Sequence, residues 1–175
     1  IAALLDVDLD IIKNLLEETF AAKQHLIASN MEAIHFGYDY TRDNFPCPLP
    51  MHMEKMDETE GHIVIDGNTA AGLGCMYAGA TVGAWYPITP STSLMDAFRM
   101  FCARYRVDPE TGKRTYCIIQ AEDGRAAIGM VLGESWNGAR SFTPTSGPGI
   151  SLMSEFIGFG YYAEIPAVLF NVQRT

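Results

Sequence analysis

Apolar residues recur at helical spacing in the first part of the chain. Residues 9–20 place them on one face with acidic side chains opposite, which predicts an amphipathic helix. Residues 26–36 predict a second short helix. This helix is expected to end at Gly37, because glycine commonly follows the last turn of a helix. Residues 1–41 are therefore expected to form a helical hairpin.

The periodicity disappears over residues 42–61, which contain three prolines, three methionines and several acids and are expected to be a linker. After it, strand-like and helix-like segments alternate over residues 62–175. Strands are expected at 63–65, 80–88, 116–121, 140–143 and 167–172, and helices at 69–77, 90–105, 125–136 and 150–162. This alternation predicts an α/β fold with a doubly wound, mainly parallel sheet.

The sequence Tyr-Pro-Ile-Thr-Pro-Ser-Thr-Ser stands between the second predicted strand and its helix. Thr89 is expected to be the N-cap, because Pro90 suits the first helical position, where no amide partner is needed. The helix that follows has one apolar face that should pack on the sheet, formed by Leu94, Met95, Phe98, Phe101, Cys102 and Tyr105.

Polar or glycine-rich residues follow each of the last four predicted strands. Thr89 follows the second strand, residues 120–123 the third, 145–149 the fourth and 173–174 the fifth. Ligands of open parallel sheets bind beyond the carboxyl ends of the strands. A site is therefore expected along the side of the sheet where the strands end, which we call the rim. The same residue types also serve as plain caps and turns, and that interpretation stays open.

The composition excludes several function classes. The chain has 12 basic and 21 acidic residues, a net charge of −9 and no basic cluster, which argues against nucleic acid as a partner. Its four cysteines lie far apart, so no zinc or iron–sulfur ligand set is visible, and reduced thiols in a cytoplasmic protein are expected. No apolar run is long enough to span a bilayer, so no membrane partner is expected.

Five motifs in the predicted sheet domain occur in the order found in one known family. They are Gly67-Asn68, Tyr-Pro-Ile-Thr-Pro-Ser at 86–91, Gln-Ala-Glu-Asp at 120–123, Thr-Ser-Gly-Pro-Gly at 145–149 and Val-Gln-Arg at 172–174. Together they resemble the alpha subunit of 2-oxoacid:ferredoxin oxidoreductases, the 2-oxoglutarate type most closely. Residues 1–41 resemble the end of a gamma domain fused ahead of alpha, so the chain is expected to be a fragment across that junction.

The resemblance implies a sheet of the thiamine diphosphate pyrimidine-binding type. It also implies that a beta subunit supplies the diphosphate and Mg ligands and an iron–sulfur cluster, with no metal on this chain. Consistently, no Gly-Asp-Gly motif occurs here. The implied activity is CoA-dependent oxidative decarboxylation of a 2-oxo acid, with ferredoxin as electron acceptor. The expected assembly is a dimer of gamma–alpha/beta units, and this chain is expected to be inactive alone.

The resemblance also assigns site residues. Thr89 matches a threonine that hydrogen-bonds the substrate or the cofactor-bound intermediate, and Arg174 matches an arginine that engages its carboxyl or oxo group. A guanidinium suits that task because its planar fork binds a carboxylate through two parallel bonds. An ordinary ion pair is the alternative for Arg174. The cofactor crevice is expected to be lined by Pro87, Ser91, Thr145, Ser146 and Gly147.

One position departs from the family pattern. The family usually has a glutamate that hydrogen-bonds the aminopyrimidine, and this chain has Gly124 there. Glu122 and Asp123 are then the candidate catalytic acids. The loss of the glutamate leaves a second hypothesis open, a non-catalytic assembly relative of the same family. A third is the pyrimidine-binding domain of another thiamine enzyme, of the transketolase or acetolactate synthase kind, where Thr-Ser-Gly-Pro-Gly also occurs.

Overall fold

The computed structural model describes residues 1–54, 56 and 58–174. The chain divides into two compact units, Ile1–Ile63 and Val64–Thr175. Lys55 and Asp57 of the predicted linker lie outside the described residues, as does Thr175 at the end of the predicted sheet domain.

The first unit contains the predicted helical hairpin, formed by α1 (Leu9–Thr19) and α2 (His25–Asn44). The end predicted for the second helix at Gly37 is wrong. The helix continues through Gly37 to Asn44, since an interior glycine costs a helix only about 1 kcal/mol. Within it the hydroxyl of Thr41 donates to the Gly37 carbonyl oxygen at 2.8 Å. After α2 the backbone amide of Leu49 donates to the Leu4 carbonyl oxygen at 2.9 Å, which ties part of the predicted linker to this unit.

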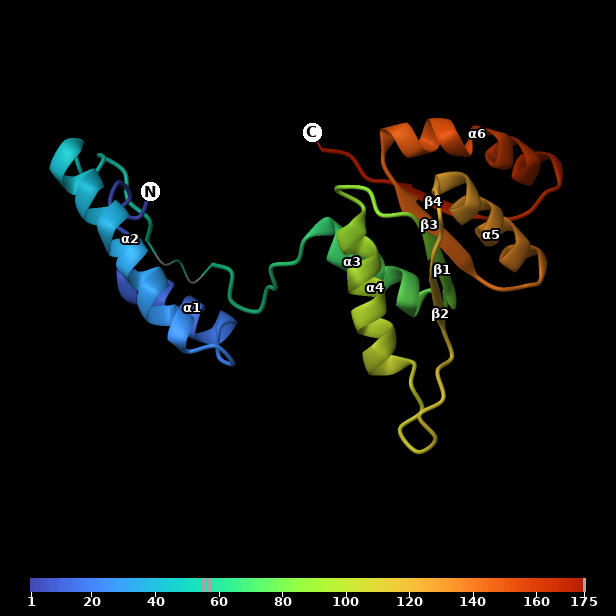
Figure 1. The fold of residues 1–175 in the computed structure, drawn as a ribbon, viewed down its shortest axis with the longest axis horizontal. Coiled ribbons are helices and arrows are strands. Elements are labelled where there is room, and N and C mark those ends of the chain that lie inside the picture. Colours follow the sequence, from blue (N-terminus) through green and yellow to red (C-terminus); the bar gives the residue numbers. More distant parts are fainter. Residues whose placement is uncertain (55, 57, 175) are drawn as a thin grey trace. The chain divides into compact units, whose positions relative to one another are not determined.

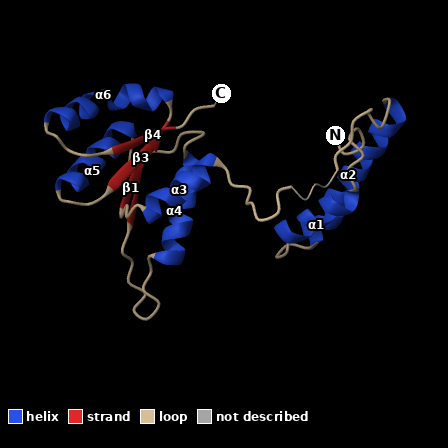
Figure 2. Ribbon diagram, turned by 180° about the vertical axis from the view of Figure 1, so that it is seen from behind, coloured by secondary structure: helices blue, strands red, loops and turns tan. Residues whose placement is uncertain are grey.

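The second unit is a four-stranded sheet of order β2-β1-β3-β4 in which all neighbouring strands are parallel. Helices α3 and α4 cover one face and α5 and α6 the other (Figures 1 and 2). The predicted doubly wound parallel fold is therefore confirmed. In chain order the elements are α3 (Gly67–Tyr77), β1 (Val82–Trp85), α4 (Thr92–Tyr105), β2 (Cys117–Gln120), α5 (Gly124–Trp136), β3 (Ser141–Thr145), α6 (Gly147–Tyr162) and β4 (Val168–Asn171).

Three local predictions are wrong. Residues 63–65 form no strand, because Ile63 and Val64 are exposed and no strand within the described part of the chain pairs with them. The N-cap of α4 is Ser91, not Thr89, because the Ser91 amide and hydroxyl both donate to the Ile88 carbonyl oxygen at 2.8 Å and close a turn ahead of the helix. Helix α6 begins at Gly147 rather than at residue 150, so the glycines after β3 belong to its first turn.

Each face of the sheet has its own core. On the α3/α4 side, Phe98 and Phe142 meet edge to face with ring centroids 4.8 Å apart. The predicted apolar face of α4 is buried there, except that Phe101 is only partly buried and Tyr105 is 53% exposed at the end of the helix. On the α5/α6 side the buried residues are Ala84, Ala121, Ala127, Ile128, Val131, Leu132 and Met153.

All four cysteines are free thiols. Cys75 and Cys102 are buried between α3 and α4, and burial raises the pKa of the Cys75 thiol to about 11 and that of Cys102 above its ordinary value. Both therefore act as small apolar core residues. Among the described helices, none is both long and apolar enough to cross a bilayer.

Glu134 on α5 carries a buried carboxylate oxygen, Oε2, with no hydrogen-bond partner among the described residues. Burial raises the pKa of this carboxyl, so the folded state favours the protonated acid and stability falls as pH rises through the unfolded and then the folded pKa. We expect Glu134→Gln to stabilise the protein by about 1 kcal/mol at pH 7 and by much less at pH 4. Thermal unfolding at the two pH values measures this, and equal effects at both would contradict it.

Candidate functional site

The carboxyl ends of the four strands meet at one rim, because all strands are parallel. Hydrogen bonds continue the sheet just past the strands. The Ala121 amide donates to the Trp85 carbonyl oxygen at 2.7 Å, and the Val172 amide donates to the Thr145 carbonyl oxygen at 2.9 Å. The loops after β1 and β2 therefore start side by side, as do those after β3 and β4. Figure 1 shows the chain leaving β4 at this end of the sheet.

The loop after β1 contains Pro87, Thr89 and Ser91. Ser91 is fully buried and closes the turn described above, whereas Pro87 and Thr89 are exposed at the rim. The Thr89 side chain makes no hydrogen bond to any described residue. Its hydroxyl is therefore available to a ligand, while Ser91 shapes the loop.

The junction between β3 and α6 presents two nearly buried hydroxyls. Thr145 is 3% exposed and Ser146 is 8% exposed, and neither side chain has a hydrogen-bond partner within the described part of the chain. A Cβ at Gly149 would lie 1.9 Å from Thr145 Oγ1, so only glycine fits there. Because Gly147 opens α6, its backbone amide lies at the same rim as these hydroxyls, whereas Pro148 has no amide proton and the Gly149 amide donates to the Ser146 carbonyl oxygen at 2.9 Å.

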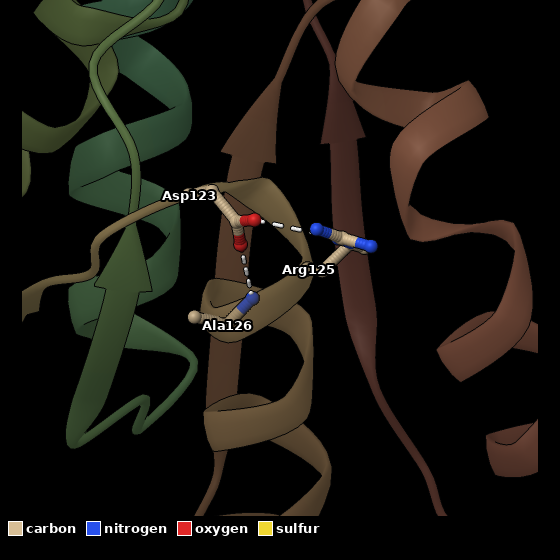
Figure 3. A network of polar contacts seen from close by, with 3 residues as sticks. All are labelled: Asp123, Arg125 and Ala126. Atoms are coloured by element: carbon tan, nitrogen blue, oxygen red, sulfur yellow. Dashed lines mark hydrogen bonds and ion pairs between the residues drawn. The ribbon is translucent and has the colours of Figure 1, made fainter.

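The loop from β2 to α5 places the two predicted acids differently. Asp123 caps α5: its Oδ1 accepts the Ala126 amide at 2.7 Å, and its Oδ2 lies 3.3 Å from Arg125 Nε (Figure 3). These contacts, the Ala126 hydrogen bond most of all, hold the pKa of Asp123 below its usual range. Glu122 is exposed and forms no hydrogen bond with the described residues. Of the two carboxylates, that of Glu122 is the available one.

Gly124, the first residue of α5, has room for a side chain. A Cβ built there would lie 3.4 Å from Met153 Cε and 3.9 Å from Met153 Cγ, which is ordinary van der Waals contact. Its backbone is also not in the left-handed region that favours glycine. The fold therefore does not require glycine at this position.

Arg174 follows β4 at the same rim and is exposed. Within the described residues it has no ion-pair partner. Strand β3 separates β1 from β4, so the ends of the strands that precede Thr89 and Arg174 are about 10 Å apart. The structure therefore brings the loops of all predicted site residues to the rim formed by the carboxyl ends of the strands.

Asn68 belongs to one of the motifs quoted above, but the sequence suggested no role for it. Its side-chain nitrogen Nδ2 donates to the Pro90 carbonyl oxygen at 2.9 Å. The partner lies 22 residues away. No local sequence signal reveals such a contact.

The comparisons with known proteins agree on one family. The profile described as pyruvate flavodoxin/ferredoxin oxidoreductase, thiamine diphosphate-binding, matches residues 73–175. The chain is 40% identical over 124 residues to the 2-oxoacid:ferredoxin oxidoreductase subunit alpha of Saccharolobus solfataricus, covering 69% of this chain and 20% of the relative. It is 42% identical over 110 residues to the 2-oxoglutarate synthase subunit KorA of Methanothermobacter thermautotrophicus, covering 63% of this chain and 27% of that protein.

A solved structure also matches nearly the whole chain. It is a 2-oxoglutarate:ferredoxin oxidoreductase from Magnetococcus marinus with 2-oxoglutarate, coenzyme A and succinyl-CoA bound. The TM-score is 0.70 and the sequence identity 32%, over 99% of this chain and 29% of the other. The chain thus spans less than a third of the length of each of these relatives.

Proposed function

The chain belongs to the thiamine diphosphate-binding family of pyruvate flavodoxin/ferredoxin oxidoreductases, and on that premise we propose that it is part of a 2-oxoacid:ferredoxin oxidoreductase. The reaction is CoA-dependent oxidative decarboxylation of a 2-oxo acid to an acyl-CoA, with electrons passed to ferredoxin. The observation that carries the proposal is the convergence of Thr89, Glu122, Ser146 and Arg174 from four loops at one rim. 2-Oxoglutarate is the favoured substrate because the matched solved structure holds it.

The rim residues fit the pyrimidine half of thiamine diphosphate. Thr145 and Ser146 offer hydroxyls without partners among the described residues, Gly147 offers a backbone amide at the start of α6, and Pro87 offers an apolar surface. Among the described residues, no group of three His, Cys, Asp or Glu side chains is placed to hold a metal ion. When bound, the cofactor supplies the electron sink that cleavage beside a carbonyl needs.

Glu122 is the proposed proton-holding acid of this chain, because the Asp123 carboxylate caps α5 and contacts Arg125. Asp123 contributes by fixing the start of α5, next to the position where the family usually has glutamate. An acid that hydrogen-bonds the ring nitrogen works best when it is shielded from water. Glu122 is exposed in this chain, so a partner surface would have to cover it.

Thr89 and Arg174 are the proposed substrate-binding residues. The Thr89 hydroxyl would donate to the oxo group, and the Arg174 guanidinium would hold the carboxylate of the 2-oxo acid through two parallel bonds. We expect Arg174→Lys to raise the KM for the 2-oxo acid about tenfold or more, since a lysine cannot form the paired contact. The KM for CoA should stay unchanged. A parallel increase in both KM values would show that the change acts on the site as a whole.

The remaining parts of the site are assigned to other subunits. We propose that a beta subunit supplies the diphosphate and Mg ligands and an iron–sulfur cluster, and that residues 1–41 are the end of a gamma-type domain. Matches over 95% of the chain to 2-oxoacid:ferredoxin oxidoreductase alpha subunits support the fused arrangement. The proposed assembly is a cytoplasmic dimer of gamma–alpha/beta units.

The proposed function is tested with the full-length polypeptide assembled with its beta partner. The complex is expected to reduce a viologen dye in the presence of thiamine diphosphate, CoA and 2-oxoglutarate, and omission of any one should abolish the signal. Pyruvate and 2-oxoisovalerate serve as competing substrates. A complex that assembles but turns over none of these acids would favour the assembly relative. Turnover without CoA or a dye acceptor would favour a different thiamine enzyme.

A further inference from the structure

We propose that Asn68 is a positioning residue that fixes the loop carrying Thr89, so that the Thr89 hydroxyl meets the 2-oxo acid in one orientation. This inference rests on the function proposed above. It adds a residue on α3, a helix that contributes none of the site residues proposed so far, and it explains how an exposed turn at the rim is held in place.

The turn that carries Thr89 has few internal restraints. Ser91 closes it by donating to the Ile88 carbonyl oxygen, but this bond lies within the turn and does not fix it relative to the rest of the unit. Thr89 itself is exposed. The start of the loop is held to the neighbouring strand, because the Trp85 carbonyl oxygen accepts the Ala121 amide. The part of the loop after Trp85 therefore needs an anchor from another element.

Asn68 provides that anchor. Its Nδ2 donates to the Pro90 carbonyl oxygen at 2.9 Å and to the Ser93 hydroxyl at 2.7 Å. Among the described residues, these are the hydrogen bonds that reach residues 86–93 from another helix. One amide group thus joins the turn next to Thr89 with the first turn of α4.

The position of Asn68 is itself fixed. Asp66 caps α3 by accepting the Thr69 amide at 2.9 Å and the Thr69 hydroxyl at 2.5 Å, which also lowers the pKa of the Asp66 carboxyl. Further along, α3 packs closely on α4 at Gly72. Asn68 therefore projects from a rigid helix start. Its side-chain amide can hold the loop with little loss of conformational entropy, because the backbone that carries it is already ordered.

Two variants in the assembled complex separate positioning from simple loss of stability. Asn68→Ala removes the anchor, whereas Ile128→Val opens a small cavity in the α5/α6 core and leaves α3, Pro90 and Ser93 untouched. Hydrogen exchange of the peptide covering residues 86–93, measured without cofactor or substrate, reports the order of the loop. The dissociation constant of 2-oxoglutarate, measured by calorimetry on the cofactor-loaded complex, reports the consequence for the substrate.

We expect Asn68→Ala to speed exchange of residues 86–93 about tenfold and to weaken 2-oxoglutarate binding by a similar factor, since two hydrogen bonds are lost. Ile128→Val should leave both values near wild type while lowering the melting temperature. The inference is overturned if Asn68→Ala changes neither value, if exchange rises without any loss of affinity, or if Ile128→Val has the same effects. A wild-type complex that binds no 2-oxo acid would instead count against the proposed function.

Discussion

Placing a glutamate at position 124 is expected to raise 2-oxoglutarate-dependent viologen reduction by the complex about 100-fold or more. A positioned acid contributes about 10² to 10⁴ to the rate of a proton-transfer step. This chain has glycine where its family usually has that acid, and Glu122 substitutes for it poorly because it is exposed to water. The structure leaves room for a Cβ at this position. A Cβ at Gly124 meets only Met153, at 3.4 Å, and an acidic side chain suits the first turn of α5.

The matched control is Gly124→Gln, which adds nearly the same volume without an acid. It should leave the rate near that of the unmodified complex, and so separates the carboxyl group from the mere filling of space. A rate that rises equally in both variants would show that packing against Met153 matters rather than proton transfer. If the unmodified complex already turns over rapidly and Glu122→Gln abolishes that activity, Glu122 has taken over the role.

Replacing Gly72 with alanine is expected to destabilise the second unit by about 3 kcal/mol and to lower its melting temperature by roughly 10 °C. The added Cβ would lie 2.9 Å from the Phe98 backbone nitrogen, 3.0 Å from the Leu94 carbonyl oxygen and 2.9 Å from Ala97 Cβ. Backbone atoms of α4 cannot move aside as the end of a flexible side chain can. Helices α3 and α4 would therefore have to separate.

Gly74 on the same helix offers the control. Nothing lies within 4 Å of a Cβ built there, so Gly74→Ala should stabilise the protein by about 0.5 to 1 kcal/mol through the higher helix propensity of alanine. Thermal unfolding followed by circular dichroism measures both variants. Similar melting temperatures for the two would show that α3 and α4 are not packed as closely as the structure indicates.

The sequence predicted the elements whose signals are local or periodic. Alternating apolar segments indicated the parallel sheet and its helices, and the spacing of Leu94, Met95 and Phe98 identified the buried face of α4. Errors occurred where an element depends on distant neighbours. Residues 63–65 are apolar enough for a strand but pair with no strand among the described residues. The early end predicted for α2 has a local cause instead, because one interior glycine costs a helix too little to end it.

For the candidate site, too, some features were predictable from the sequence and others only from the tertiary structure. The motifs and the parallel-sheet rule placed the loops of Thr89, Glu122, Thr145 and Arg174 at one rim before any coordinates, since strand direction follows from chain order in such folds. Only the tertiary structure showed that Asp123 is engaged as a helix cap, that Gly124 has room for a side chain and that Asn68 anchors the turn at Pro90. The last two facts depend on contacts between residues on different elements, and sequence spacing carries no information about such distances.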